Sequence, residues 1–115
     1  MSVLEGKNIL LGVTGSIAAY KSIILLRLLK REGADVQVIF SDSANNFVTQ
    51  LTFSTLSEKK VLTDFFEDDD KVEWVNHVEL AEWADYMIIA PITSSTLSKL
   101  VTGNADNLLV ATYMS

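Results

Sequence analysis

The sequence predicts an α/β fold in which a mostly parallel sheet is covered by helices. Three segments of strand length, residues 8–13, 35–40 and 86–90, are separated by segments expected to be helical. The first is a short apolar run, which is typical of a parallel strand that is buried on both faces. The alternation of strands with helices indicates one doubly wound domain.

The first two strands and the segment between them form a βαβ unit. The run 8–13 leads through Thr14-Gly15-Ser16 into a helix expected over 17–32, and Gly33 stands where such a helix would stop. The second strand follows at 35–40. The side chains of this helix expected to face the sheet are Ile17, Tyr20, Ile24, Leu25, Leu28 and Leu29.

The rest of the chain is expected to be largely helical up to and beyond the third strand. Ser54 is a candidate N-cap, and the acidic run 68–70 is expected to form an exposed turn. The strand 86–90 ends at the single proline, Pro91. The further helices are expected over residues 43–51, 54–60, 77–84, 94–101 and 105–113.

Length and charge limit the classes of protein that fit. A chain of 115 residues suits a single domain, 1–115, with one hydrophobic core. It carries 9 Lys and Arg against 15 Asp and Glu, and residues 61–115 hold only two of the basic groups but ten of the acidic ones. Because a nucleic-acid partner requires cations that neutralise phosphates, this balance argues against general DNA or RNA binding.

Residue usage also argues against metal sites and membrane insertion. Cysteine is absent and His77 is the single histidine, so thiolate and histidine-cluster metal sites are not expected. No apolar run approaches the roughly 20 residues of a membrane span, and residues 1–7 do not resemble a signal peptide. We therefore expect a cytoplasmic protein without a membrane partner.

The carboxyl ends of the three strands carry small and hydroxylated residues. They are Thr14-Gly15-Ser16, the run 41–43 and the run 91–95, which would meet at one sheet edge where open α/β sheets bind ligands. Each could serve only as an ordinary helix N-cap, but together they favour a phosphate-bearing ligand. Ala18 stands where the dinucleotide fingerprint has its third glycine, and a Gly-Lys-Ser/Thr loop is missing, so a mononucleotide fits better than NAD or ATP.

Five stretches together resemble the homo-oligomeric flavin-containing cysteine decarboxylases. The segment HVEL resembles the family's His-[Ile/Val]-[Glu/Asp]-Leu active-site motif, and GNADNLL resembles its Gly-x-Ala-Asp-Asn-Leu helix start. The resemblance covers nearly the whole chain in order, and phosphopantothenoylcysteine decarboxylase is the most similar branch. The matching stretches are GVTGSIAAYK (12–21), SDSANNFV (41–48), HVEL (77–80), APITSSTL (90–97) and GNADNLL (103–109).

The resemblance implies a Rossmann-like (flavodoxin-like) three-layer sandwich that binds FMN. It implies decarboxylation of 4′-phosphopantothenoylcysteine to 4′-phosphopantetheine in coenzyme A biosynthesis, by a homo-oligomer that is a trimer or a dodecamer. The FMN phosphate would lie near Gly15, Ser16 and Ile17, with the Ser41 hydroxyl and the Phe47 ring nearby.

The resemblance also assigns the flavin ring and the active-site base. The ring would lie along residues 91–94, Asn107 would hold the ribityl side or the substrate carboxylate, and His77 would be the base. Taken without the resemblance, a lone histidine is more often structural than catalytic. The residues expected along the ring are Pro91, Ile92, Thr93 and Ser94.

Two family features are missing from the sequence, and alternatives to the decarboxylase remain. The substrate-gripping Pro-x-Met-Asn motif and the clamp cysteine do not occur, so we expect a domain truncated at its C-terminus and catalytically incomplete on its own. The alternatives are a non-catalytic FMN-binding or interaction module, and a sister enzyme such as a peptidyl-cysteine decarboxylase or a prenyl-FMN synthase. The context of His77 argues against prenyl transfer.

Overall fold

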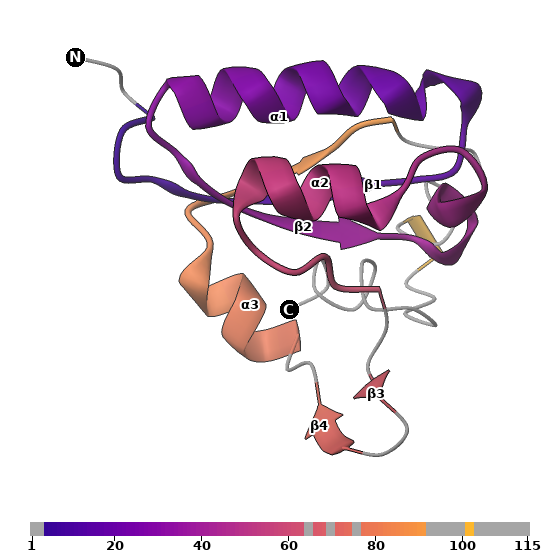
Figure 1. Ribbon diagram of the computed structural model, residues 1–115. Helices are drawn as coiled ribbons and strands as arrows, with labels where there is room; N and C mark the ends of the chain where they lie inside the picture. The colour runs from indigo at the N-terminus through magenta and orange to yellow at the C-terminus, as the bar shows by residue number, and fades with distance from the viewer. Residues whose placement is uncertain (1–3, 64–65, 69–70, 75–76, 92–100, 103–115) are drawn as a thin grey trace.

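Helices cover both faces of a parallel sheet, as Figure 1 shows for this computed structural model. The strands follow the order β2–β1–β5, and β1 pairs in parallel with both neighbours. The sheet consists of β1 (Asn8–Val13), β2 (Asp35–Phe40) and β5 (Tyr86–Ile89). The structure describes residues 4–63, 66–68, 71–74, 77–91 and 101–102, and of 66–68, 71–74 and 77 only the backbone.

Two α-helices lie on one face of the sheet and a third lies on the other face. A short antiparallel pair, β3 (Phe66–Asp68) with β4 (Lys71–Trp74), projects away from these layers (Figure 1). No helix in the described ranges is long and apolar enough to span a membrane. The helical elements are η1 (Ile17–Tyr20), α1 (Lys21–Arg31), η2 (Asp42–Asn46), α2 (Gln50–Ser57) and α3 (His77–Trp83).

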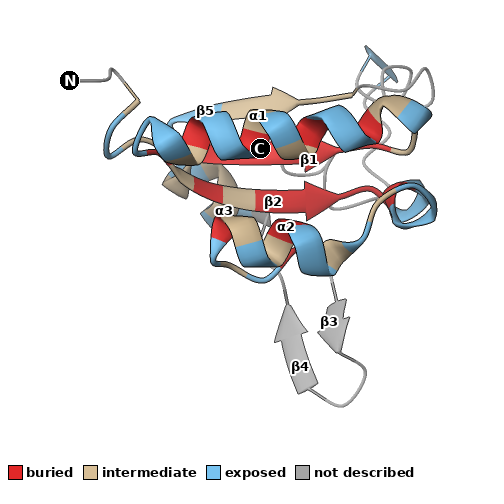
Figure 2. Cartoon of the chain, turned by 45° about the horizontal axis from the view of Figure 1, so that its top comes forward, coloured by how far each residue is buried: buried red, intermediate tan, exposed pale blue. Residues whose placement is uncertain are grey.

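The alternation of side chains along the strands divides the core into two layers. Leu11 of β1 packs with Leu26 of α1 and Phe53 of α2 on one face. Leu10, the residue before it, packs with Leu80 of α3 on the other. Figure 2 shows that β1 and β2 are almost wholly buried between these layers. Burial on both faces explains why β1 is apolar from Ile9 to Val13, whereas β2 keeps two polar residues at its half-buried positions Asp35 and Gln37. The predicted three-layer α/β class is confirmed.

The buried side of the first helix differs from the prediction. The positions that face the core are Ala19, Ser22, Leu26 and Leu29. Four of the residues expected to be buried are instead exposed, because this helix carries apolar residues on more sides than the sheet can cover. Their exposed fractions are 83% for Ile17, 56% for Tyr20, 57% for Ile24 and 46% for Leu28.

The segment after β2 also differs from the prediction. Thr49 caps α2, and its hydroxyl accepts a hydrogen bond from the backbone N–H of Thr52 at 3.5 Å. Ser54, the expected N-cap, therefore lies inside α2. The β3–β4 pair was not predicted, and its middle residues 69–70 lie outside the described part, as do 94–100 and 105–113 of the expected helices.

Candidate functional site

The carboxyl ends of the three parallel strands are joined by hydrogen bonds at one edge of the sheet. The backbone N–H of Ser41, just after β2, donates to the carbonyl oxygen of Val13 at the end of β1 at 2.9 Å. The buried Thr14 hydroxyl donates to the carbonyl oxygen of Pro91, which follows β5. Since the three strand ends are locked together, residues far apart in the sequence meet here as predicted.

The turn after β1 lies against the segment after β2. A Cβ atom at Gly15 would lie 2.4 Å from the Ser43 Oγ and 2.8 Å from the Ser43 carbonyl carbon. Because the backbone itself is in the way, no side chain fits at position 15. The Ser41 and Ser43 hydroxyls are 3.4 Å apart, so hydroxyl groups flank the glycine closely.

Ser16 begins the helical segment that leads away from this edge. Its backbone is extended, and its side chain accepts a hydrogen bond from the Ala18 N–H at 3.1 Å. The segment continues through η1 into α1 without a break and ends at Arg31. A helix N-terminus carries partial positive charge, so this end of the sheet attracts an anion without a basic side chain. Ile17, the first helical residue, is exposed to solvent.

A hollow of about 290 Å³ is lined by the first turns of the helical segment and by the residues after β5. The buried Ser22 hydroxyl donates to the carbonyl oxygen of Ala90 beside it and so ties α1 to the strand end. Apolar groups form most of the wall. The lining residues are Ala18, Lys21, Ser22, Leu25, Ala90 and Pro91.

Of the remaining residues expected at the site, the structure describes Phe47 and the backbone of His77. Phe47 follows η2 and is 46% exposed, so its ring is available to a ligand at this end of the sheet. His77 is the first residue of α3, and its side chain lies outside the described part. The other expected contacts lie outside the described residues: Ile92, Thr93, Ser94 and Asn107.

Three hydroxyl residues at this edge were not predicted as site residues from the sequence. Thr14 and Ser43 belong to the strand-end runs, but their contacts with Pro91 and Gly15 depend on the tertiary fold. Only Ser22 could have been found from the sequence, because a serine within an apolar stretch of helix requires a hydrogen-bond partner if it is buried.

A family model described as Flavoprotein matches residues 2–114. The chain belongs to the flavoprotein family. It is 41% identical over 113 residues to the coenzyme A biosynthesis bifunctional protein CoaBC of Bacillus subtilis. The aligned part makes up 98% of the chain and 28% of that protein. The corresponding protein of Haemophilus influenzae is 42% identical over 106 residues, 92% of the chain and 26% of its own length.

Solved structures agree with this assignment of the flavoprotein fold. MrsD from a Bacillus species superposes with a TM-score of 0.87 and 27% identity, over 99% of the chain and 64% of MrsD. The FMN-dependent cysteine decarboxylase SpaF superposes with a TM-score of 0.85 and 26% identity, over 97% of the chain and 64% of SpaF. The chain thus spans little more than a quarter of the curated relatives it matches, and about two thirds of these structures.

Proposed function

We propose that this flavoprotein catalyses the FMN-dependent decarboxylation of 4′-phosphopantothenoylcysteine to 4′-phosphopantetheine. The observation that carries the proposal is the 41% identity to a coenzyme A biosynthesis bifunctional protein over 98% of the chain. The solved neighbour SpaF is an FMN-dependent cysteine decarboxylase, so reaction class and cofactor point the same way.

The geometry of the strand ends suits the phosphate of FMN. A ligand phosphate needs close approach to the backbone, hydrogen-bond donors and a favourable field. Gly15 leaves the backbone of this turn without a side chain and lets it pack directly against Ser43. The hydroxyls of Ser16, Ser41 and Ser43 provide donors, and the start of the helix ending at Arg31 provides the field. The cofactor assignment therefore rests on this chain's own residues as well as on its relatives.

The chemistry assigns separate tasks to the strand ends and to the start of α3. Loss of CO2 leaves the electron pair of the broken C–C bond on a substrate carbon, which requires an electron acceptor. Bound FMN supplies the two-electron oxidation and reduction that make this loss feasible. The residues after β1 and β2 bind and orient the cofactor, and His77 at the start of α3 holds or removes a substrate proton.

A His77→Asn variant of the full-length protein tests the reaction, because residues 1–115 hold neither the Pro-x-Met-Asn motif nor the clamp cysteine. We expect the rate of CO2 release to fall at least about 100-fold, because a positioned acid or base contributes a factor of this size. FMN should remain bound, as measured by its visible absorption, because the phosphate site lies after β1 and β2. Unchanged CO2 release would contradict the assignment of His77 and favour a non-catalytic FMN-binding role.

The same assay separates two substrate classes. One solved neighbour is the peptidyl-cysteine decarboxylase EpiD, with a TM-score of 0.78 and 25% identity. Phosphopantothenoylcysteine and a peptide ending in cysteine should therefore be compared at equal concentration. Preference for the peptide would replace the proposed substrate but retain the reaction.

We also propose that the protein forms a homo-oligomer through α1. The exposed apolar residues of this helix segment follow one another at intervals of three or four positions, so they form one stripe along its length. Contiguous exposed apolar surface typically marks a contact with another protein surface. The stripe consists of Ile17, Tyr20, Ile24 and Leu28.

A further inference from the structure

The helix that begins at His77 is fastened to the sheet at its opposite end. Trp83 is the last residue of α3, and the side-chain amide of Asn8 donates to its carbonyl oxygen at 3.1 Å. The last carbonyls of a helix have no partner within the helix, so Asn8 supplies one. Asn8 is the first residue of β1, the central strand.

Asp85 doubles this connection. Its backbone N–H donates to the Asn8 carbonyl at 2.7 Å, and its carboxylate accepts from the Asn8 backbone N–H at 2.8 Å. Asn8 therefore makes three hydrogen bonds to the three-residue segment from Trp83 to Asp85. Such a reciprocal arrangement fixes both the position and the direction in which the chain leaves α3.

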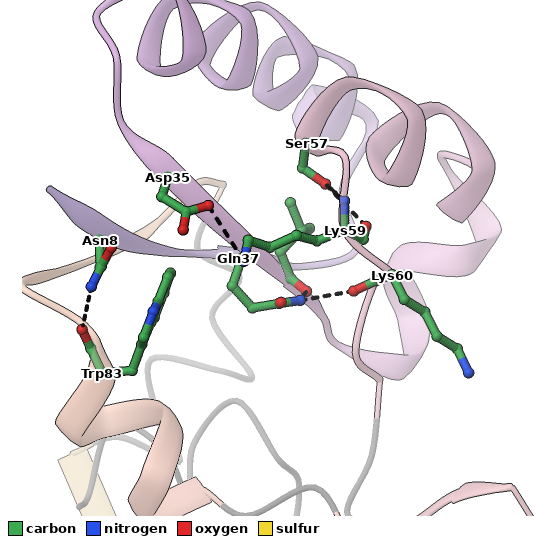
Figure 3. A network of polar contacts seen from close by, with 8 residues as sticks. Asn8, Asp35, Gln37, Ser57, Lys59, Lys60 and Trp83 are labelled. Atoms are coloured by element: carbon green, nitrogen blue, oxygen red, sulfur yellow. Dashed lines mark hydrogen bonds and ion pairs between the residues drawn. The ribbon is translucent and has the colours of Figure 1, made fainter. Parts of the chain in front are cut away.

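A cation holds the indole ring of Trp83 from another side. The Lys59 Nζ lies 5.4 Å from the centre of this ring and 3.4 Å from an Asp35 carboxylate oxygen at the start of β2. Figure 3 shows Lys59 reaching from the segment after α2 toward Asp35, with Asn8 and Trp83 close by. Because Trp83 also packs against the cluster formed by Leu10 and Ile39, its orientation is constrained from the sheet and from the neighbouring loop.

The helical repeat connects this end of α3 to the other. Positions 77, 80 and 84 lie on one side of a helix with 3.6 residues per turn, and Leu80 and Ala84 pack on the sheet. Position 77 therefore belongs to the sheet-facing side, about 9 Å along the axis from Trp83. If α3 rotated about its axis at the Trp83 end, position 77 would turn by the same angle.

We propose that Asn8, Lys59, Trp83 and Asp85, here called the α3 anchor, position His77 for its reaction. These are positioning residues, since their contacts lie at the amino ends of the strands, away from the edge that holds Gly15 and Ser41. The proposal rests on the proposed function insofar as it concerns the reaction of His77. The orientation of α3 itself is measurable without that reaction.

The test uses two variants of the α3 anchor and a matched control. Asn8→Ala removes the amide that caps α3, and Lys59→Met removes the cation but keeps an apolar side chain of similar length. Lys60→Met is the control, because the adjacent Lys60 side chain points away from Trp83 (Figure 3). Circular dichroism and flavin absorption establish that each variant is folded and loaded with FMN.

We expect kcat to fall about tenfold in both anchor variants, with KM changed less than threefold, since general acid–base catalysis depends on position. His77 is the single histidine, so its imidazole proton resonance is unambiguous by NMR, and we expect it to shift in both variants. Lys60→Met should alter neither quantity.

Two results separate failure of this inference from failure of the proposed function. Folded, FMN-loaded anchor variants with the wild-type kcat or the wild-type imidazole resonance would overturn the inference. A full-length wild-type protein that is inactive on both cysteine substrates, with an imidazole resonance that still shifts in the variants, would overturn the decarboxylase instead and leave the positioning of His77 supported.

Discussion

At the scale of single residues, Ser16 has two roles that a substitution can separate. Its side chain caps the first helical turn, and the proposed function gives it a second role as a phosphate donor. Aspartate is as good an N-cap as serine and interacts favourably with a helix N-terminus. The Ser16→Asp variant should therefore keep the free energy of unfolding of the FMN-free protein within about 0.5 kcal/mol of wild type.

The same variant should bind FMN at least about tenfold more weakly, because a second anion faces the phosphate. Fluorescence titration measures the affinity, and urea unfolding measures the stability. Ser16→Ala is the matched control: it loses the cap, with about 1 kcal/mol of stability, but introduces no charge. Equal FMN affinity in Ser16→Asp and wild type would contradict the placement of the phosphate beside Ser16.

At the scale of elements, the turn after β1 and the helix η2 depend on each other. In Gly15→Ala the new Cβ must displace Ser43, whose carbonyl carbon would be 2.8 Å away. We expect the FMN affinity to fall at least about tenfold and the free energy of unfolding to fall by about 1–3 kcal/mol, as for other overpacked contacts. Titration and urea unfolding again provide the measurements.

A second substitution shows whether this contact is the cause. In Gly15→Ala with Ser43→Gly, the Oγ and Cβ atoms nearest the new methyl group are removed, but the carbonyl carbon remains. Recovery of FMN affinity should thus be partial. Ser43→Gly alone is the control, because this substitution also removes a proposed phosphate donor. If Ser43→Gly alone binds FMN like wild type and the double variant binds it no better than Gly15→Ala, the loss has a source other than this contact.

The same elements show how far the sequence determines the structure. The strand β1 is predictable because a doubly buried strand is continuously apolar, and Ile9–Val13 are all buried. The apolar residues of β2 and β5 also predict strands, although Asp35 and Gln37 of β2 are half-buried and no residue of β5 is fully buried. The buried side of α1 could not be predicted, because its apolar residues lie on several sides and packing against the sheet decides which of them are buried. The local sequence pattern likewise predicted Ser54 as an N-cap, whereas Thr49 caps α2 in the structure.

Much of the candidate site was predictable for a related reason. Residues that directly follow strands meet at one edge of a parallel sheet whatever the helices do, so Gly15, Ser41 and Pro91 come together as expected. The bond from Ser22 to Ala90 depends on how α1 rotates against β5. The sequence contains no local signal for that rotation.

At the scale of the whole molecule, the layers give each surface a separate task. The sheet edge after β1, β2 and β5 gathers the polar groups of the proposed cofactor site, and α3 on the opposite face carries His77. Apart from Ile17, which lies beside the proposed phosphate site, the exposed stripe on η1 and α1 contributes to neither. It is therefore the surface that a substitution can change without disturbing the site.

Ile24→Asp tests whether this stripe joins copies of the protein. Ile24 is 57% exposed, so a carboxylate there costs the isolated chain little, whereas burial in an interface would leave the charge without water. We expect the molar mass measured by light scattering to fall to that of a smaller assembly. Leu51→Asp on α2, at a residue 75% exposed and outside the stripe, should leave the wild-type mass. If Ile24→Asp keeps the assembly but lowers the free energy of unfolding by several kcal/mol, the stripe is covered within one subunit and the oligomer forms through another surface.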